Sequence, residues 1–266
     1  MMEFDGKVAV VTGGSSGIGQ AAAHMLAARG ASVAICGIDP DEVDTTMASL
    51  PTSNGRVLGV AADVTDEAAI GRLIERTMAR FGGIDIVVTA AGIQRYGTVA
   101  DTSAEEWDQV HAVNVRGAFL TIKHALPHLR ARESGSIVIV SSVQAYVSQT
   151  AVAAYTSSKA ALNALARSVA VDEAAHGIRA NAVCPASVDT PMLRAAAARF
   201  SDGTPAGAQA LLDSWGRMHP LGRVARASEI AEVIAFLASD RSSFITGIGL
   251  PVDGGLLAAA SVALPK

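Results

Sequence analysis

The chain has 266 residues, of which 50% are hydrophobic and only 4% aromatic, and its formal net charge is −4. This length suits one large domain or two small ones and allows a substantial buried core. The acidic balance and the lack of a dense lysine and arginine run exclude a nucleic-acid-binding surface. No apolar run approaches the roughly 18 residues that span a bilayer. The acidic start does not resemble a signal peptide, so we expect a cytoplasmic protein without a membrane segment.

Short runs rich in β-branched residues alternate along the chain with longer helical stretches. We expect strands at 7–12, 31–36, 56–61, 84–89, 136–141 and 178–184. We expect helices at 18–29, 67–80, 104–130, 156–175 and 228–238. Strands that are apolar on both faces and alternate with helices indicate a parallel sheet covered on both sides. The sequence therefore predicts an α/β fold, a single Rossmann-type domain over 1–266 with a doubly wound parallel sheet in three α/β/α layers.

A glycine-rich turn follows the first predicted strand, where the sequence TGGSSGIG runs from Thr12 to Gly19. Its glycines permit a tight turn, close approach of backbone to a pyrophosphate, and close packing of helix on sheet. The helix that follows offers free N–H groups and a positive dipole end to phosphates. Because the motif lies between a strand and a helix, it predicts dinucleotide binding rather than a plain turn. The expected contacts are Gly13, Ser15, Ser16, Gly17, Ile18 and Gly19.

The sequence AAYTSSKAALNAL places Tyr155 and Lys159 four residues apart, on one face of a predicted helix. A cation beside a phenol lowers a pKa that is otherwise about 10, so such a pair can pass a proton to or from an alcohol oxygen. Ser142 stands just past the fifth predicted strand, where its hydroxyl can bond the same oxygen. Taken alone, these residues would be a surface tyrosine, a solvated lysine and a turn serine. Together they favour catalysis.

The spacing TGxxxGxG, with YTSSK downstream, resembles the short-chain dehydrogenase/reductase family, from KVAVVTGGSSGIG to FITGIGLPVDGG. The resemblance implies an NAD(P)-dependent oxidoreductase acting on CH–OH groups. It implies Tyr155 as general acid/base, Ser142 orienting the substrate oxygen, and Lys159 tuning Tyr155 while contacting the nicotinamide ribose. It also implies that Asn114, a polar residue in an apolar helical stretch, holds a water linking Lys159 to solvent. The alternative is that Asn114 simply bonds to backbone.

Further cofactor contacts follow from the same resemblance. Asp63 and Val64 match the adenine-contacting pair, and CPASVDTPM is similar to the segment against the nicotinamide carboxamide, with Val188 and Thr190 as its contacts. Turn formation is the alternative interpretation of both stretches.

The chain departs from the family pattern in two places. Where the family usually has Asn-Asn-Ala-Gly, this chain has Thr89 followed by Ala90, Ala91 and Gly92. The backbone there still meets the adenosine, but an amide that stabilises the sheet is lost. Ala186 replaces a usual glycine and adds a methyl close to the nicotinamide.

The stretch VAICGIDPDE, at the end of the second strand, bears on the choice between NAD and NADP. An acid there bonds the ribose hydroxyls of NAD and repels a 2′-phosphate, and in the family it commonly stands at the position of Gly37. NADP users tend to carry arginine at the position of Ile38, or a basic residue at that of Ser16. Asp39 lies two residues late, and a local bend would bring it to the ribose. With Ile38 and Asp39 as contacts, and Asp41 nearby, we expect NAD rather than NADP.

The substrate pocket is expected after the fourth and fifth strands and under 187–218, an irregular stretch that we interpret as a substrate-covering insertion. The candidate lining residues are Gln94, Arg95, Tyr96, Gln144, Tyr146, Gln149 and Trp215. We expect Gln94 and Gln144 to contact substrate beside Ser142 and Tyr155. The glutamines suit a small secondary alcohol or ketone such as a sugar or polyol, or else they face solvent. NADPH-dependent 3-oxoacyl reductases share the same core motifs and stay as an alternative.

Three further hypotheses remain. A catalytically silent dinucleotide-sensing protein is the non-enzyme alternative, although Tyr155 and Lys159 are both intact. His124 and His128 have i, i+4 spacing but no apparent third ligand, so we expect surface histidines and no metal site. The segment 249–266 is apolar for an exposed end, which burial in a subunit interface would relieve. The resemblance implies a homotetramer.

Overall fold

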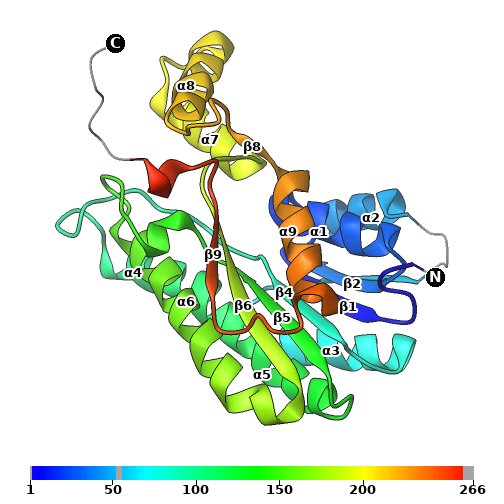
Figure 1. Ribbon diagram of the computed structural model, residues 1–266. Helices are drawn as coiled ribbons and strands as arrows, with labels where there is room; N and C mark the ends of the chain where they lie inside the picture. The colour runs from blue at the N-terminus through cyan, green and yellow to red at the C-terminus, as the bar shows by residue number, and fades with distance from the viewer. Residues whose placement is uncertain (1, 52–55, 260–266) are drawn as a thin grey trace.

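The computed structural model describes residues 2–51 and 56–259, and its centre is one parallel sheet (Figure 1). The strand order is β3-β2-β1-β4-β5-β6-β9. The strands are β1 (Val8–Thr12), β2 (Ser32–Gly37), β3 (Val57–Ala61), β4 (Ile86–Thr89), β5 (Gly135–Val140), β6 (Ile178–Pro185) and β9 (Gly249–Val252). The first six confirm the predicted strands within two residues. No strand was predicted at β9, because the glycine and proline in its sequence GLPV weaken the strand pattern.

The sheet reverses its winding at β1. This strand pairs in parallel with β2 on one side and with β4 on the other, as Val10 shows by lying opposite both Ala34 and Val87. The chain therefore builds β1, β2 and β3 outward and then returns to continue from β4. At such a switch point the loops that follow the two strands diverge and leave a crevice for ligands.

Helices cover both faces of the sheet (Figure 1). Alternate residues of β1 face the two layers, because successive side chains of a strand point to opposite sides. Val11 packs in one cluster with Leu26 of α1, and Val10 packs in the other with Leu73 of α3 and Leu162 of α6. Both faces of the central strands are thus buried, and the predicted three-layer architecture is confirmed.

The principal helices are α1 (Gly17–Ala28), α2 (Pro40–Ser49), α3 (Glu67–Phe81), α4 (Ala104–His111), α5 (Gly117–Arg130), α6 (Ala153–Glu173) and α9 (Ala227–Ala238). The predicted helices agree with α1, α3, α6 and α9 within three residues. The expected single helix at 104–130 is interrupted by a π-helix over Ala112–Arg116. Helix α2 was not predicted, although Asp39 as a cap and Pro40 in the first turn are start signals.

The segment 187–218 is more regular than predicted, because it contains two helices. These are α7 (Pro191–Phe200) and α8 (Pro205–Arg217), which stand together beyond the sheet in Figure 1. Each begins with a proline in its first turn, after a threonine whose hydroxyl caps the helix. The short strands β7 (Val188–Asp189) and β8 (Ala225–Arg226) pair at the base of this segment. Alanine-rich sequence and clear start signals explain why it is helical.

Other features bear on the remaining sequence hypotheses. Within the described ranges, no helix is long and apolar enough to cross a membrane. The same residues hold no group of three or more His, Cys, Asp or Glu side chains that could bind a metal ion. His124 instead lies 3.2 Å from a carboxylate oxygen of Glu67. The thiols of Cys36 and Cys184 are free and buried, and burial raises the pKa of Cys36 to about 12.

Candidate active site

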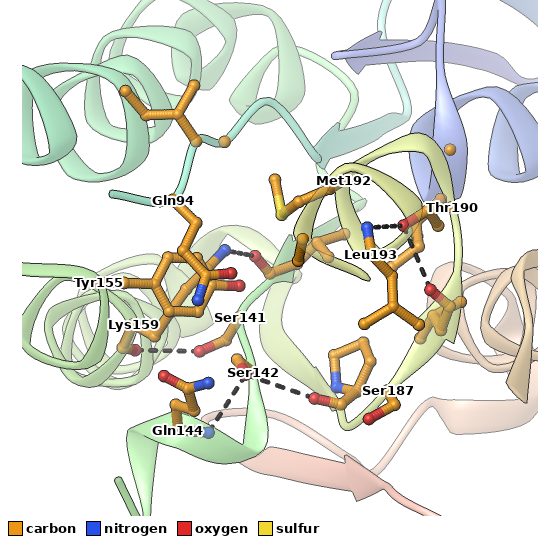
Figure 2. Close-up of a pocket in the computed structure, with 18 of the residues that line it drawn as sticks. Gln94, Ser141, Ser142, Gln144, Tyr155, Lys159, Ser187, Thr190, Met192 and Leu193 are labelled. Atoms are coloured by element: carbon orange, nitrogen blue, oxygen red, sulfur yellow. Dashed lines mark hydrogen bonds between the residues drawn. The ribbon is translucent and has the colours of Figure 1, made fainter. Parts of the chain in front are cut away.

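A cavity of about 1380 Å³ opens at the carboxyl ends of the strands, beside the switch point. Figure 2 shows its centre, where Ser142 follows β5 and the side chains of Tyr155 and Lys159 come from α6. The predicted site residues in its wall are Gly13, Ser15, Ser16, Gly17, Ile18, Ile38, Asp63, Val64, Ala90, Ala91, Gly92, Gln94, Ser142, Gln144, Tyr155, Lys159, Val188 and Thr190. The predicted residues Gly19, Asp39 and Asn114 are not part of this wall.

The glycine turn after β1 is held by contacts that only glycine allows. Gly13 has φ of +64°, and a Cβ there would lie 2.6 Å from the amide nitrogen of Ala91. A Cβ at Gly19 would lie 2.1 Å from the carbonyl oxygen of Gly13. Gly19 therefore supports the turn from behind rather than lining the cavity. Ser16 precedes α1 without a side-chain cap, which leaves the first N–H groups of this helix for a ligand.

The loop after β4 faces this turn. Ala90, Ala91 and Gly92 line the cavity through a chain segment that packs against Gly13. At Thr89, where the family usually has asparagine, the hydroxyl oxygen is buried and has no hydrogen-bond partner among the described residues. This agrees with the predicted loss of a sheet-stabilising amide.

Ser142, Tyr155 and Lys159 form one buried cluster. Tyr155 lies in the first turn of α6, and its side chain is hydrogen-bonded to Ser142. The Ser142 hydroxyl also accepts from the Gln144 amide at 3.1 Å. The Lys159 ammonium donates to the Val140 carbonyl at 2.9 Å and lies 5.3 Å from the centre of the Tyr155 ring. The structure thus brings together the three residues expected to act on the substrate oxygen.

Burial decides the protonation of this cluster. It raises the pKa of Tyr155 to about 12, against the opposing effect of the hydrogen bond from Ser142, and it lowers the pKa of Lys159 to about 8. The expected lowering of the phenol pKa is wrong for the protein alone. The physical reason is that desolvation of the phenol outweighs its other interactions, while the ammonium is itself buried against Val140. At neutral pH Tyr155 keeps its proton and can donate it.

Asn114 sits in the π-helix between α4 and α5, where it is almost fully buried. Its side-chain oxygen accepts from the Ile93 amide at 2.8 Å, and its amide group donates to the Ile93 carbonyl and to Ser158, each at 3.0 Å. The side chain therefore bonds to backbone, as the alternative interpretation predicts. It ties the loop after Gly92 to α6 directly beside Lys159. The hypothesis of a relay water stays a prediction.

The adenosine end of the cavity differs from the sequence prediction at one acidic residue. Asp39 lies outside the wall, because its carboxylate caps α2 by accepting from the amides of Asp41 at 2.9 Å and Glu42 at 3.4 Å. Glu42 lines the wall instead, beside Ile38. Sequence analysis missed Glu42, although the start signals of α2 would have placed it in the first turn of a helix.

The substrate end is lined by side chains from distant segments. Gln94, Arg95, Tyr96, Gln144, Gln149 and Trp215 line it as predicted. Tyr146 does not, and its hydroxyl donates to the Gly249 carbonyl at 2.6 Å. The lining residues that the sequence analysis missed include Val147, Met192, Phe200, Met218, His219, Leu256 and Leu257. Tyr96 and Phe200 meet edge to face, with ring centres 4.8 Å apart, and so join the loop after β4 to α7.

The sequence and the fold are similar to those of known dehydrogenases and reductases. A family model described as enoyl-(acyl carrier protein) reductase matches residues 13–257. The cis-4-hydroxycyclohexanecarboxylate dehydrogenase of Sinomonas cyclohexanicum is 42% identical over 96% of this chain and 98% of that protein. The meso-2,3-butanediol dehydrogenase of Serratia marcescens is 38% identical over 100% of this chain and 99% of that protein. The ligand-free structure of Thermoplasma acidophilum aldohexose dehydrogenase covers 100% of both chains, with a TM-score of 0.91 and 34% identity.

The fold and site thus define a hydride-transferring oxidoreductase that acts on CH–OH groups and has a Rossmann-type fold. Within this class, the chain belongs to the short-chain dehydrogenase/reductase family. The family and class of enzyme predicted from the sequence are confirmed. Dehydrogenases of this family use NAD or NADP as cofactor.

Proposed function

We propose that this enzyme interconverts a small secondary alcohol and its ketone with NAD as the hydride carrier, and that the alcohol bears a second oxygen group. The observation that supports this most directly is one continuous cavity. Its wall joins the glycine turn at one end to Ser142, Tyr155 and Lys159 at its centre. Such a cavity holds a dinucleotide and a small substrate in contact with each other.

The residues of the turn fit a nicotinamide dinucleotide. Backbone at Gly13 leaves no room for a side chain, and the uncapped start of α1 presents N–H groups where a pyrophosphate would bind. Asp63 and Val64 line the adenosine end, and Val188 and Thr190 line the part beyond the turn. The bound cofactor supplies or accepts the hydride.

The chain's own side chains handle the proton. Tyr155, which keeps its proton at neutral pH, donates it to the oxygen of a ketone. In the oxidation direction Tyr155 first releases its proton to solvent, and the resulting phenolate accepts the proton of the alcohol. Ser142, hydrogen-bonded to Tyr155, orients that oxygen. Lys159, whose ammonium lies 5.3 Å from the centre of the Tyr155 ring, would hold the nicotinamide ribose. Asn114 fixes the Ile93 carbonyl beside it, where the relay water would bind.

The lining of the substrate end suits a compound that is partly apolar and carries a second polar group. Met192, Phe200 and Trp215 give it an apolar wall. Figure 2 shows Gln94 beside Tyr155 and Gln144 beside Ser142, and both side-chain amides can hydrogen-bond a hydroxyl or a carboxylate. Arg95 lines the same end and donates to the Gln94 carbonyl at 3.2 Å. Two relatives are named for secondary alcohols with a second oxygen group, a hydroxycyclohexanecarboxylate and a butanediol.

The proposal is tested by comparing matched alcohols with NAD⁺ and following NADH absorbance. We expect 2,3-butanediol to exceed 2-butanol, and 4-hydroxycyclohexanecarboxylate to exceed cyclohexanol, by about tenfold in kcat/KM, the worth of one good hydrogen bond to substrate. Equal values within both pairs would contradict the proposed second oxygen group. Turnover of a 3-oxoacyl thioester with NADPH alone would favour the acyl reductase. Binding of NADH without turnover of any compound would favour the silent sensor.

The proposal includes how the substrate is covered and how the subunits assemble. We infer that α7 and α8 cover bound substrate, since α7 contributes Met192 and Phe200 to the wall. We infer a homotetramer in which the apolar C-terminal segment is buried. Residues 260–266 of that segment lie outside the described residues. Light scattering at micromolar concentration tests the assembly, and a monomer would contradict it.

A further inference from the structure

The end of β2 leaves no room for an acid at the strand itself. Gly37 is the last residue of β2, and a Cβ there would lie 2.2 Å from the Ser15 hydroxyl oxygen and 2.9 Å from the Ser15 Cβ. Both distances are far below van der Waals contact. The Ser15 side chain therefore occupies the space that a side chain at position 37 would need.

Glu42 brings a carboxylate to this place from the neighbouring helix. The Ser15 hydroxyl donates to a carboxylate oxygen of Glu42 at 3.4 Å. Glu42 lines the main cavity and also a smaller hollow between α1 and α2. Its carboxylate thus lies at the hydroxyl that fills the space beside Gly37.

The helix that carries Glu42 is fixed to the glycine turn. The Asp39 carboxylate caps the start of α2 through the amides of Asp41 and Glu42. One turn later, the buried Thr46 hydroxyl donates to the Ser15 carbonyl at 3.1 Å and accepts from the Gln20 side-chain amide at 2.9 Å. The cap orders the start of α2, and the Thr46 bonds hold its second turn against the glycine turn and α1, so the position of Glu42 is set by the fold.

The charges at this end favour an uncharged ribose. Among the described residues of the wall, the lysine and arginine side chains are Lys159 at the centre of the cavity and Arg95 at the substrate end. The acids of the wall are Glu42 and Asp63, and Asp63 is bonded to the amide and hydroxyl of Thr65 at 2.8 and 2.9 Å. A ribose hydroxyl can donate to Glu42, whereas a 2′-phosphate would meet its negative charge without a cation to offset it.

We propose that Glu42, oriented by Ser15, binds the adenosine ribose and sets the preference for NAD over NADP. This inference rests on the proposed dinucleotide-dependent function and deepens it by naming the selecting residue. Asp39 and Asp41, the acids nearest to β2 in sequence, have no direct part in the selection.

The test is a fluorescence titration of the whole purified chain with NADH and with NADPH at one pH and ionic strength. We expect Glu42→Gln to lower the ratio of the NADPH to the NADH dissociation constant about tenfold, as a charge-assisted hydrogen bond and a repulsion are both removed. The matched control is Asp41→Asn. It removes the same charge one residue earlier, at a side chain that lines the smaller hollow but not the main cavity. We expect it to change the ratio by less than about twofold.

A second variant tests the positioning residue. Ser15→Ala leaves the charge of Glu42 in place but removes its hydrogen bond, and we expect the ratio to fall about threefold. A merely structural loss at the turn would weaken both cofactors equally and leave the ratio unchanged.

Equal effects of Glu42→Gln and Asp41→Asn would overturn the inference while leaving dinucleotide binding intact. Tighter binding of NADPH than NADH by the unaltered chain would also overturn it. Failure to bind either cofactor would overturn the proposed function as well, so the two failures are distinguishable.

Discussion

The two ends of the cavity are built in different ways. The dinucleotide end consists of backbone and small residues fixed by the sheet, such as Gly13 and Ala91, with Gly19 packed behind them. The substrate end consists of large side chains from loops and from α7, such as Tyr96 and Phe200. A fixed backbone end suits a cofactor common to a family, whereas side chains on a separate pair of helices can change without disturbing the sheet.

The largest expected effect lies where the two ends meet. Replacing Tyr155 by phenylalanine removes the proton donor but keeps the ring and its packing. We expect kcat/KM to fall by roughly 10² to 10⁴, the usual worth of a positioned acid/base, with NADH affinity unchanged. Steady-state kinetics and a fluorescence titration check both quantities. Near-normal turnover by a folded variant would remove Tyr155 from the mechanism.

A methyl group at Gly19 tests the rigidity of the dinucleotide end. Because its Cβ would lie 2.1 Å from the Gly13 carbonyl oxygen, we expect Gly19→Ala to lower the free energy of unfolding by about 3 kcal/mol and to weaken NADH binding. The matched control is Gly71→Ala in α3, where a Cβ would meet only His124 atoms at ordinary contact distances of 3.8 and 3.9 Å. Alanine there should leave stability unchanged or raise it by up to about 1 kcal/mol. Similar denaturation curves for the two variants would contradict the rigidity of the dinucleotide end.

The buried ammonium of Lys159 gives the centre of the cavity a pH dependence. Burial lowers its pKa from 10.5 to about 8, so between these values the unfolded chain holds a proton that the folded chain has released. The free energy of unfolding therefore rises with pH in this window, and this gain is lost as pH falls toward 8. We expect the free energy of unfolding of the unaltered chain to rise by about 2 kcal/mol relative to that of Lys159→Met from pH 8 to 10. Urea denaturation at both pH values measures this change. The same difference in free energy of unfolding between the two proteins at pH 8 and pH 10 would contradict it.

The substrate end should respond in affinity rather than in stability. Phe200→Ala removes the edge contact with Tyr96 from an exposed position on α7. We expect the free energy of unfolding to change by less than about 1 kcal/mol and KM for the alcohol to rise about threefold to tenfold. NADH affinity should stay the same. A large fall in the free energy of unfolding would show that the packing of α7 is as important to the fold as that of the glycine turn.

The same difference explains what the sequence could predict. The buried strands and the glycine turn are local patterns, so six strands, the crevice and the placement of Ser142, Tyr155 and Lys159 were predictable. Glu42 was missed because its place depends on a helix that starts directly after Asp39 and bonds to Ser15. The raised pKa of Tyr155 was missed because burial is a property of the packed fold.

The substrate end was predicted only in part. Gln94 and Gln144 follow strands directly, which makes their place readable from the chain. His219 is nearly buried in the same wall, with its ring bonded at Nδ1 to the Asp253 carbonyl at 2.8 Å. That contact joins residues far apart in sequence, and no local pattern signals it.

The π-helix at 112–116 fixes the number of residues that this segment can contain. A π turn accommodates one more residue than an α-helical path between the same ends. Deleting one residue would let α4 and α5 merge into a continuous α-helix between the same ends, and the side chains of the π-helix itself would change direction. The Asn114 amide would then leave the Ile93 peptide that it holds at 2.8 and 3.0 Å. This segment therefore accepts an exchange of one amino acid for another more readily than the insertion or deletion of one.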